Sequence, residues 1–147
     1  MKFIDIYFNY KQKYEDYIII YLVGNFYQIL GEDTKIMNEI FHYKVLVDSN
    51  GISKVGFPLN SLEKVKKRLK YENINFIIVE KEDGIVKIKK KQKFNNNQYH
   101  CYNQRAIENH KRTKQIEIIT NKLYSLNNEK YDELMKEIEK ILWKINY

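Results

Sequence analysis

The chain has 147 residues, which suits one compact domain and is too short for two independent hydrophobic cores. Hydrophobic residues make up 44% of it, with one proline and five glycines, and this excludes a disordered chain or long flexible linkers. The formal net charge of +7 favours a polyanionic partner, nucleic acid first and an anionic membrane surface second, with a merely skewed composition as the alternative.

The first element is predicted to be an amphipathic helix that ends near Asp16. Its apolar residues recur at steps of three and four, which places them on one face of a helix. These residues are Phe3, Ile6, Tyr7, Tyr10 and Tyr14. The solvent-facing side is expected to carry Lys11, Lys13 and Glu15.

Two strands and a helix are predicted next. The unbroken apolar run over residues 17–23 is typical of a buried strand, and Gly24 and Asn25 form a turn after it. The chain returns as a strand over residues 26–30, which places Phe26 and Gln28 on one strand face, a pairing suited to a base stack. A helix follows from Glu32 to about His42 and has acidic residues at its N-terminus.

The remainder of the first part is predicted to contain four more strands and one helix. Strands over residues 43–47 and 52–57 flank Asn50-Gly51, which is typical of a type I′ hairpin. A helix beginning at residue 60 or 61 exposes basic side chains, and strands over residues 75–80 and 85–88 close the series. The order predicts an α/β fold with a mixed β-sheet and flanking helices.

The basic residues are concentrated in one region. Nine of them and a single acid lie between Val86 and Lys114, so the rest of the chain is close to neutral. The candidates for contact with a nucleic-acid backbone are Lys87, Lys89, Lys90, Lys91, Lys93, Arg105, Lys111, Arg112 and Lys114. Interleaved aromatic residues, Phe94, Tyr99 and Tyr102, are candidates to stack on single-stranded bases, and a solvated basic loop is the alternative.

Two helices are predicted at the C-terminal end, over residues 104–126 and 129–145. Each has an apolar face, and together they are expected to form an antiparallel hairpin that packs on the α/β layer or on another chain. The predicted organisation is an α/β domain over residues 1–89, a basic linker over 90–103 and a helical hairpin extension over 104–147.

No catalytic, metal or cofactor site is predicted. The three histidines lack paired ligand spacing, and acids at Glu80, Glu82 and Asp83 fit a solvated turn better than a nuclease metal site. Cys101 has no partner for a disulfide, the start lacks a secretory signal and no apolar run is long enough to cross a membrane, so a cytoplasmic, non-membrane protein is expected.

Four blocks of residues resemble the N-terminal mismatch-recognition domain of the MutS family of DNA mismatch repair proteins. They are residues 13–16 (KYED), 21–33 (YLVGNFYQILGED), 56–62 (GFPLNSL) and 76–80 (FIIVE). The second block is similar to the family's Gly-Asp-Phe-Tyr-Glu-Leu-Phe signature, and the third to its Gly-Val-Pro-Tyr-His-Ala segment. The resemblance covers residues 10–82 and implies the family's fold and DNA binding.

The resemblance also implies a role for Phe26. In the family this phenylalanine stacks on a mispaired base from the minor groove of kinked DNA, and the glutamate two residues later hydrogen-bonds that base. Here Gln28 replaces the glutamate and Asn25 the aspartate, so weaker discrimination of mispairs is expected. The chain has no phosphate-binding loop of the Gly-x-x-x-x-Gly-Lys-Ser/Thr type, so the family's ATPase function is not expected here.

Two functions remain open from the sequence. The first is a non-enzymatic nucleic-acid-binding module that holds distorted, mispaired or partly single-stranded DNA, or RNA. The second is a structural accessory subunit that docks onto a nucleoprotein complex, such as a reverse transcriptase or recombinase machine, through residues 104–147, with self-association as a further possibility.

Overall fold

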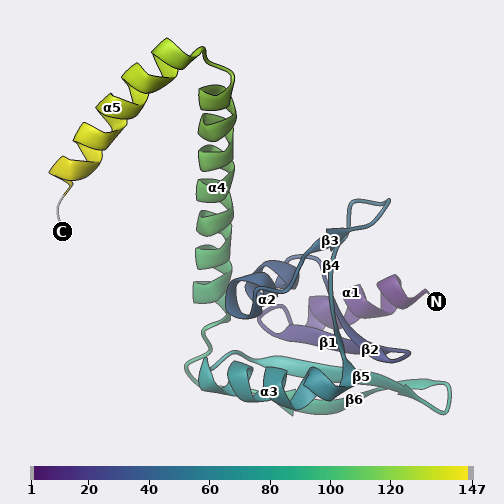
Figure 1. Ribbon diagram of the computed structural model, residues 1–147. Helices are drawn as coiled ribbons and strands as arrows, with labels where there is room; N and C mark the ends of the chain where they lie inside the picture. Colours follow the sequence, from purple (N-terminus) through teal and green to yellow (C-terminus); the bar gives the residue numbers. More distant parts are fainter. Residues whose placement is uncertain (1, 146–147) are drawn as a thin grey trace. The chain divides into compact units, whose positions relative to one another are not determined.

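A computed structural model describes residues 2–145, which divide into two compact units, Met1–Ile107 and Glu108–Tyr147. The first unit is a mixed sheet with helices on both faces (Figure 1). Its elements are α1 (Phe3–Lys13), β1 (Ile18–Val23), β2 (Phe26–Leu30), α2 (Asp33–Phe41), β3 (Leu46–Val47), β4 (Ser53–Pro58), the short 3-10 helix η1 (Leu59–Ser61), α3 (Leu62–Tyr71), β5 (Phe76–Glu82) and β6 (Ile85–Gln92). This confirms the predicted α/β fold and its order of elements.

The six strands pair in the order β3-β4-β2-β1-β5-β6. Only β1 and β5 run parallel, with Ile18 opposite Phe76 and Tyr21 opposite Val79. The other neighbours are antiparallel. The two parallel strands lie inside the sheet and are buried on both faces, which explains their unbroken apolar sequences.

The core consists of two clusters, one on each face of the sheet. Ile18 and Ile20 of β1 point toward the cluster that includes α2, α3 and the start of α4 (Tyr99–Tyr124). Ile19 and Tyr21 point to the other face, where the aromatic residues of α1 pack. Alternate residues of one strand therefore contact different helices, as the pleat of a strand requires.

The turn at Asn50-Gly51 differs from the predicted type. At Asn50-Gly51 only Gly51 has a positive φ, of 79°, and Gly51 N donates to Asp48 O, so the turn is not type I′. The Asp48 carboxylate accepts bonds from the backbone N–H groups of Asn50 and Ile52, which stabilises this longer loop. Both residues of Asp83-Gly84 have a positive φ, so the β5–β6 connection has the geometry expected of type I′.

The C-terminal part contains the two predicted helices, α4 and α5 (Asn128–Lys144). In the second unit no residue of α5 is buried, and the Asn127 side chain caps this helix by accepting a bond from Lys130 N at 2.9 Å. Strand β6 continues to Gln92 and α4 begins at Tyr99, so both ends of the segment assigned to a linker are regular structure. The division of the chain into functional domains stays a prediction.

Candidate nucleic-acid interface

The corner between β1 and β2 exposes a large aromatic side chain. Phe26 is the first residue of β2, lies opposite Val23 of β1 and Pro58 of β4, and is 52% exposed. Val23 and Leu59 are also exposed apolar residues at this end of the strands. We call Val23, Phe26 and Pro58 the corner patch. A half-exposed phenylalanine at the end of a rigid sheet is available to an apolar ligand surface without unfolding of the core.

Tyr27 fixes the direction of Phe26. Its ring is buried and stacks on Phe57 with centroids 5.5 Å apart, and its hydroxyl donates to Glu80 Oε1 at 3.0 Å. Burial, together with the nearby Glu80 carboxylate, raises the pKa of Tyr27 to about 12. Because neighbouring residues of a strand point to opposite faces, the burial of Tyr27 requires Phe26 and Gln28 to face the other way.

The position beside Gln28 is open. Gln28 is partly exposed and lies between Tyr21 of β1 and Gly56 of β4. A Cβ added at Gly56 would meet only the Tyr27 carbonyl oxygen, at 3.7 Å, which is an ordinary contact. Neither the backbone conformation nor a close neighbour therefore requires glycine at this position. The missing side chain leaves space next to the carboxamide, which is able to donate and to accept hydrogen bonds.

The lysines of β6 are divided between the two faces of the sheet. Lys87 lies opposite Glu80 and Lys90 opposite Ile78, on the face covered by α2 and α3. Lys91 lies opposite Ile77 on the α1 face, where its ammonium is 4.9 Å from the ring centroid of Tyr14. The run is therefore not one continuous surface, although it reads as one in the sequence.

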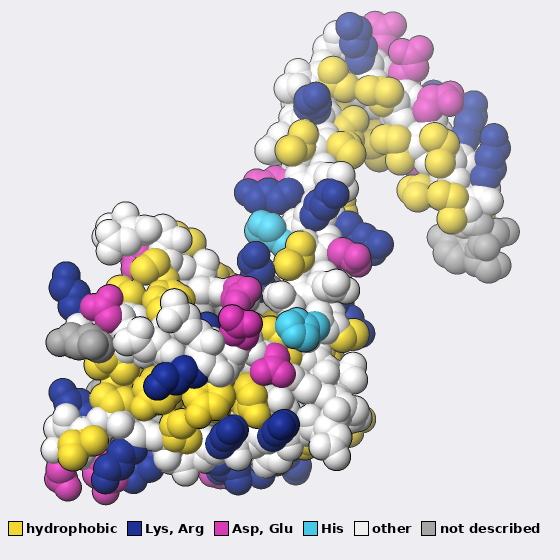
Figure 2. All heavy atoms as spheres, turned by 180° about the vertical axis from the view of Figure 1, so that it is seen from behind, with side chains coloured by type: hydrophobic (Ala, Val, Ile, Leu, Met, Phe, Trp, Pro, Cys, Tyr) yellow, Lys and Arg dark blue, Asp and Glu magenta, His cyan; other side chains and the backbone are white. Residues whose placement is uncertain are grey.

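The other basic candidates have different surroundings. Lys89 forms an ion pair with Glu82, and Lys93 is exposed just beyond β6. The guanidinium of Arg105 lies 4.7 Å from the Tyr102 ring. In the second unit the exposed basic residues of α4 are Lys111, Arg112 and Lys114. Figure 2 shows Lys and Arg side chains at the borders of exposed hydrophobic surface on the sheet unit.

One predicted base-stacking residue is part of the core instead. Tyr99 is 2% exposed, so a nucleic-acid base has no access to its ring. Tyr102 is half-buried and its hydroxyl donates to a carboxylate oxygen of Glu72. Phe94 is half-buried, with its backbone N–H donating to Asn75 Oδ1 at 2.6 Å. The prediction that single-stranded bases stack on Tyr99 is wrong. Helix α4 begins at this residue and its side chain packs into the core cluster.

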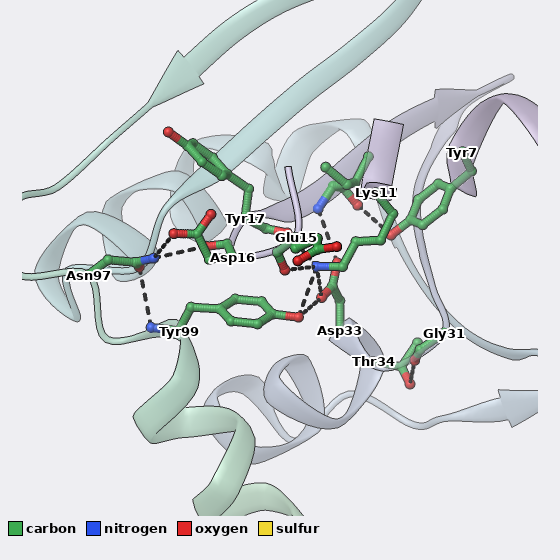
Figure 3. Close-up of polar contacts among 11 residues, drawn as sticks. Tyr7, Lys11, Glu15, Asp16, Tyr17, Gly31, Asp33, Thr34, Asn97 and Tyr99 are labelled. Carbon is green, nitrogen blue, oxygen red and sulfur yellow. Dashed lines mark hydrogen bonds and ion pairs between the residues drawn. The ribbon is translucent and has the colours of Figure 1, made fainter. Parts of the chain in front are cut away.

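A buried network around Lys11 and Asp33 was missed by sequence reasoning, which placed Lys11 in solvent and gave Asp33 only a position at a helix N-terminus (Figure 3). Lys11 Nζ lies 2.8 Å from Asp33 Oδ1, 2.8 Å from the Tyr17 carbonyl and 2.7 Å from the Glu15 carbonyl. The Tyr99 hydroxyl lies 2.9 Å from the ammonium and donates to Asp33. This pair joins α1, α2 and the first turn of α4.

The ammonium of Lys11 and the carboxylate of Asp33 stabilise each other in their charged forms. Burial raises the pKa of Asp33, while the ammonium of Lys11, the Tyr99 hydroxyl and the Ile19 N–H oppose that increase. Burial and the Asp33 carboxylate also raise the pKa of Tyr99, so its hydroxyl keeps its proton. The helical spacing contained a signal, because Lys11 is four residues after Tyr7 and Asp33 three before Ile36, both of which are fully buried.

Within residues 2–145 no cluster of three or more His, Cys, Asp or Glu side chains is arranged to hold a metal ion. In the same described part, no helix combines the length and apolar character that crossing a membrane requires.

The comparisons with known proteins agree on one family. Residues 1–98 match the family described as MutS domain I. Over 63 residues the chain is 36% identical to the DNA mismatch repair protein MutS of Petrotoga mobilis, a match that covers 43% of this chain and 8% of that protein. The chain thus corresponds to a small part of this curated relative.

Proposed function

Because the chain belongs to the MutS domain I family, we propose that it is a non-enzymatic nucleic-acid-binding module that holds distorted, mispaired or partly single-stranded DNA. The relative is a DNA mismatch repair protein, which supports DNA over RNA as the first ligand to test. The proposed contact to the bases is Phe26, with Gln28 beside it.

The exposure of Phe26 is the observation that carries this proposal. A strand phenylalanine normally packs into the core, but here Tyr27 occupies the core position and Phe26 remains half exposed. An apolar wedge unstacks a base step at a cost of a few kcal/mol, and mispaired steps resist least. The corner patch presents this wedge on a sheet whose neighbouring strands hold it in place.

The proposed backbone contacts belong to the basic segment. Lys91 lies on the same sheet face as Phe26, three strand spacings across the sheet and four residues along the strands, which together correspond to about 19 Å. We propose that Lys91 and its neighbours Lys93 and Lys89 bind phosphates of the DNA that flanks the deformed step, with Lys89 exchanging its ion pair with Glu82 for a phosphate. Each phosphate neutralised by a lysine adds to the salt dependence of binding, so affinity is expected to fall steeply between 50 and 200 mM salt.

Binding of Phe26→Ala to two duplexes tests the wedge. Wild-type protein is expected to prefer a duplex with one mispair over a matched duplex, and Phe26→Ala to lose most of that preference, because base stacking on an aromatic ring contributes about 1–3 kcal/mol. Fluorescence anisotropy at several salt concentrations measures both affinities. The control is Tyr124→Ala, which removes another exposed aromatic, 78% accessible, from the second unit.

The result that would reject the wedge is an unchanged ratio of the two affinities in Phe26→Ala. Loss of binding to every duplex, with an unchanged circular dichroism spectrum, would also contradict it, because a wedge acts on discrimination before general affinity.

A second function, an accessory subunit of a nucleoprotein complex, is favoured by the second unit. Its helices expose large apolar residues that no other described residue covers, and Figure 2 shows hydrophobic side chains on both helices. Those of α5 are Leu134, Ile141, Leu142 and Trp143. Under this function the isolated chain binds no nucleic acid, and its sedimentation coefficient rises with concentration or with an added partner. Salt-sensitive DNA binding by a monomer supports the first function instead.

A further inference from the structure

A second surface of the sheet unit combines basic side chains with exposed aromatic side chains. A hollow of about 640 Å³ lies between α2 and α3 and is lined by Ile40, Phe41, Lys64, Lys67, Arg68 and Tyr71. We call it the α2–α3 hollow. The four α3 residues recur at steps of three and four, so they share one side of that helix.

The apolar lining of the hollow is rigid on one side and open on the other. Phe41 stacks on Tyr43 with ring centroids 5.2 Å apart and planes 10° from parallel. Tyr71, at the end of α3, is 81% exposed, an unusually high value for a large aromatic residue in an ordered helix. Flat aromatic surface of this kind is where a base without a pairing partner stacks.

Two of the three positive charges that line the hollow have no ion-pair partner among residues 2–145. Arg68 is held by Glu72 at 2.9 Å, but residues 2–145 form no ion pair with Lys64 or Lys67, and both are exposed. The positive surface continues along α3 and β6, where Lys70 lies close enough to Lys90 to lower the pKa of the latter. An extended polyanion satisfies such a row of cations better than a single small anion does.

The α2–α3 hollow and the corner patch lie on opposite faces of the sheet. Val65 and Leu69 of α3 pack in the core cluster that contains Tyr27, whereas Phe26 points away from that cluster. A single-stranded nucleic acid bound in the hollow therefore does not overlap with a DNA duplex bound at Phe26.

We infer that the α2–α3 hollow binds single-stranded nucleic acid, with a base stacked on Tyr71 and phosphates held by Lys64 and Lys67. The strand continues toward Lys70 and Lys90. This inference deepens the proposed nucleic-acid binding, but it uses residues on the other face of the sheet. It makes the protein a module that holds a distorted duplex and an unpaired strand at the same time.

Three variants of the full chain test the inference, measured by anisotropy with a labelled oligothymidylate of about eight nucleotides. Tyr71→Ala is expected to weaken binding about tenfold, and the double variant Lys64→Glu with Lys67→Glu at least tenfold with a smaller salt slope. The matched control is Lys130→Glu with Lys136→Glu, which makes the same change in net charge on exposed positions of α5. It is expected to change binding less than threefold.

An abasic strand of the same length separates a base site from a general polyanion surface. Wild type is expected to bind it about tenfold more weakly than oligothymidylate, and Tyr71→Ala to make the two equal. Equal binding of both strands by the wild type, or an equal effect of the α3 and α5 charge reversals, would overturn the inference.

A competition measurement keeps this inference distinct from the proposed function. Saturation with mispaired duplex is expected to leave the oligothymidylate bound to wild type. Displacement of the strand by the duplex would overturn the inference of two surfaces. A mispair preference that Phe26→Ala retains would reject the wedge and leave the α2–α3 hollow unaffected.

Discussion

At the scale of single residues, the alternation over residues 26–28 determines what the β1–β2 corner presents. The stacked rings of Tyr27 and Phe57 and the hydrogen bond to Glu80 hold Tyr27 inside, and the strand geometry then directs Phe26 and Gln28 outward. The outward positions of Phe26 and Gln28 thus depend on Tyr27, which packs on the opposite face of the sheet. The unusual residue at this corner is Gln28, which stands where the Gly-Asp-Phe-Tyr-Glu-Leu-Phe signature that the chain resembles has a glutamate.

The substitution Gln28→Glu tests what this replacement changes. A carboxylate near phosphates is repelled by them, so affinity for matched duplex is expected to fall several-fold at low salt. Affinity for mispaired duplex is expected to fall less, because a base that is displaced from its pair is able to donate a hydrogen bond to the new carboxylate. The measurement is the ratio of the two dissociation constants at 50 and 200 mM salt.

Gln28→Ala is the appropriate control, because it removes the carboxamide without adding charge. If Gln28→Glu leaves both dissociation constants as they are in the wild type, Gln28 does not face the nucleic acid.

At the scale of elements, the pair of Lys11 and Asp33 connects three helices to the sheet. Its ammonium and carboxylate are buried, and removal of one partner from such a pair leaves a buried charge without compensation. Lys11→Met is therefore expected to lower the free energy of unfolding by about 3–5 kcal/mol at pH 7.5. Urea unfolding followed by circular dichroism measures it. The control, Lys13→Met, changes an exposed lysine of the same helix and is expected to alter stability by less than about 0.5 kcal/mol.

The pH dependence of Lys11→Met has a definite sign. Without the ammonium, burial raises the pKa of Asp33 unopposed by its main partner, so the folded variant binds a proton that the unfolded chain releases above its pKa of about 4. Stability from this group is therefore present at low pH and is lost as pH rises. The difference in stability between Lys11→Met and Lys13→Met is expected to be smaller at pH 4.5 than at pH 7.5. A difference that is constant over this range would show that water solvates Asp33.

The elements themselves follow from the sequence, whereas several side-chain positions do not. Apolar periodicity predicts α3, and an unbroken apolar run predicts the buried β1, because both signals lie in the local sequence. Charged residues such as Lys11 and Asp33 are expected in solvent, and their burial is favourable because they pair with each other, 22 residues apart, and with Tyr99, 66 residues after Asp33. The faces of the β6 lysines depend in turn on a bulge between Ile78 and Val79, which local sequence does not specify.

At the scale of the whole molecule, the sheet unit has nucleic-acid candidates on both faces, and the second unit adds a basic and an apolar helix surface. The corner patch and Lys91 share one face, while Lys87, Lys90 and α3 lie on the other. The basicity of the chain is therefore distributed over separate surfaces. This arrangement fits a protein that keeps a distorted duplex and a strand apart better than one that wraps a single duplex.

Photocrosslinking tests the central claim most directly. A duplex that carries 5-iodouracil at the mispaired position is irradiated with the protein, and mass spectrometry locates the attached peptide. The account predicts attachment at Phe26, much weaker attachment when the same 5-iodouracil is correctly paired, and none in Phe26→Ala. Attachment that is equally strong in both duplexes, or that lies only among the lysines of β6 and α3, would contradict it.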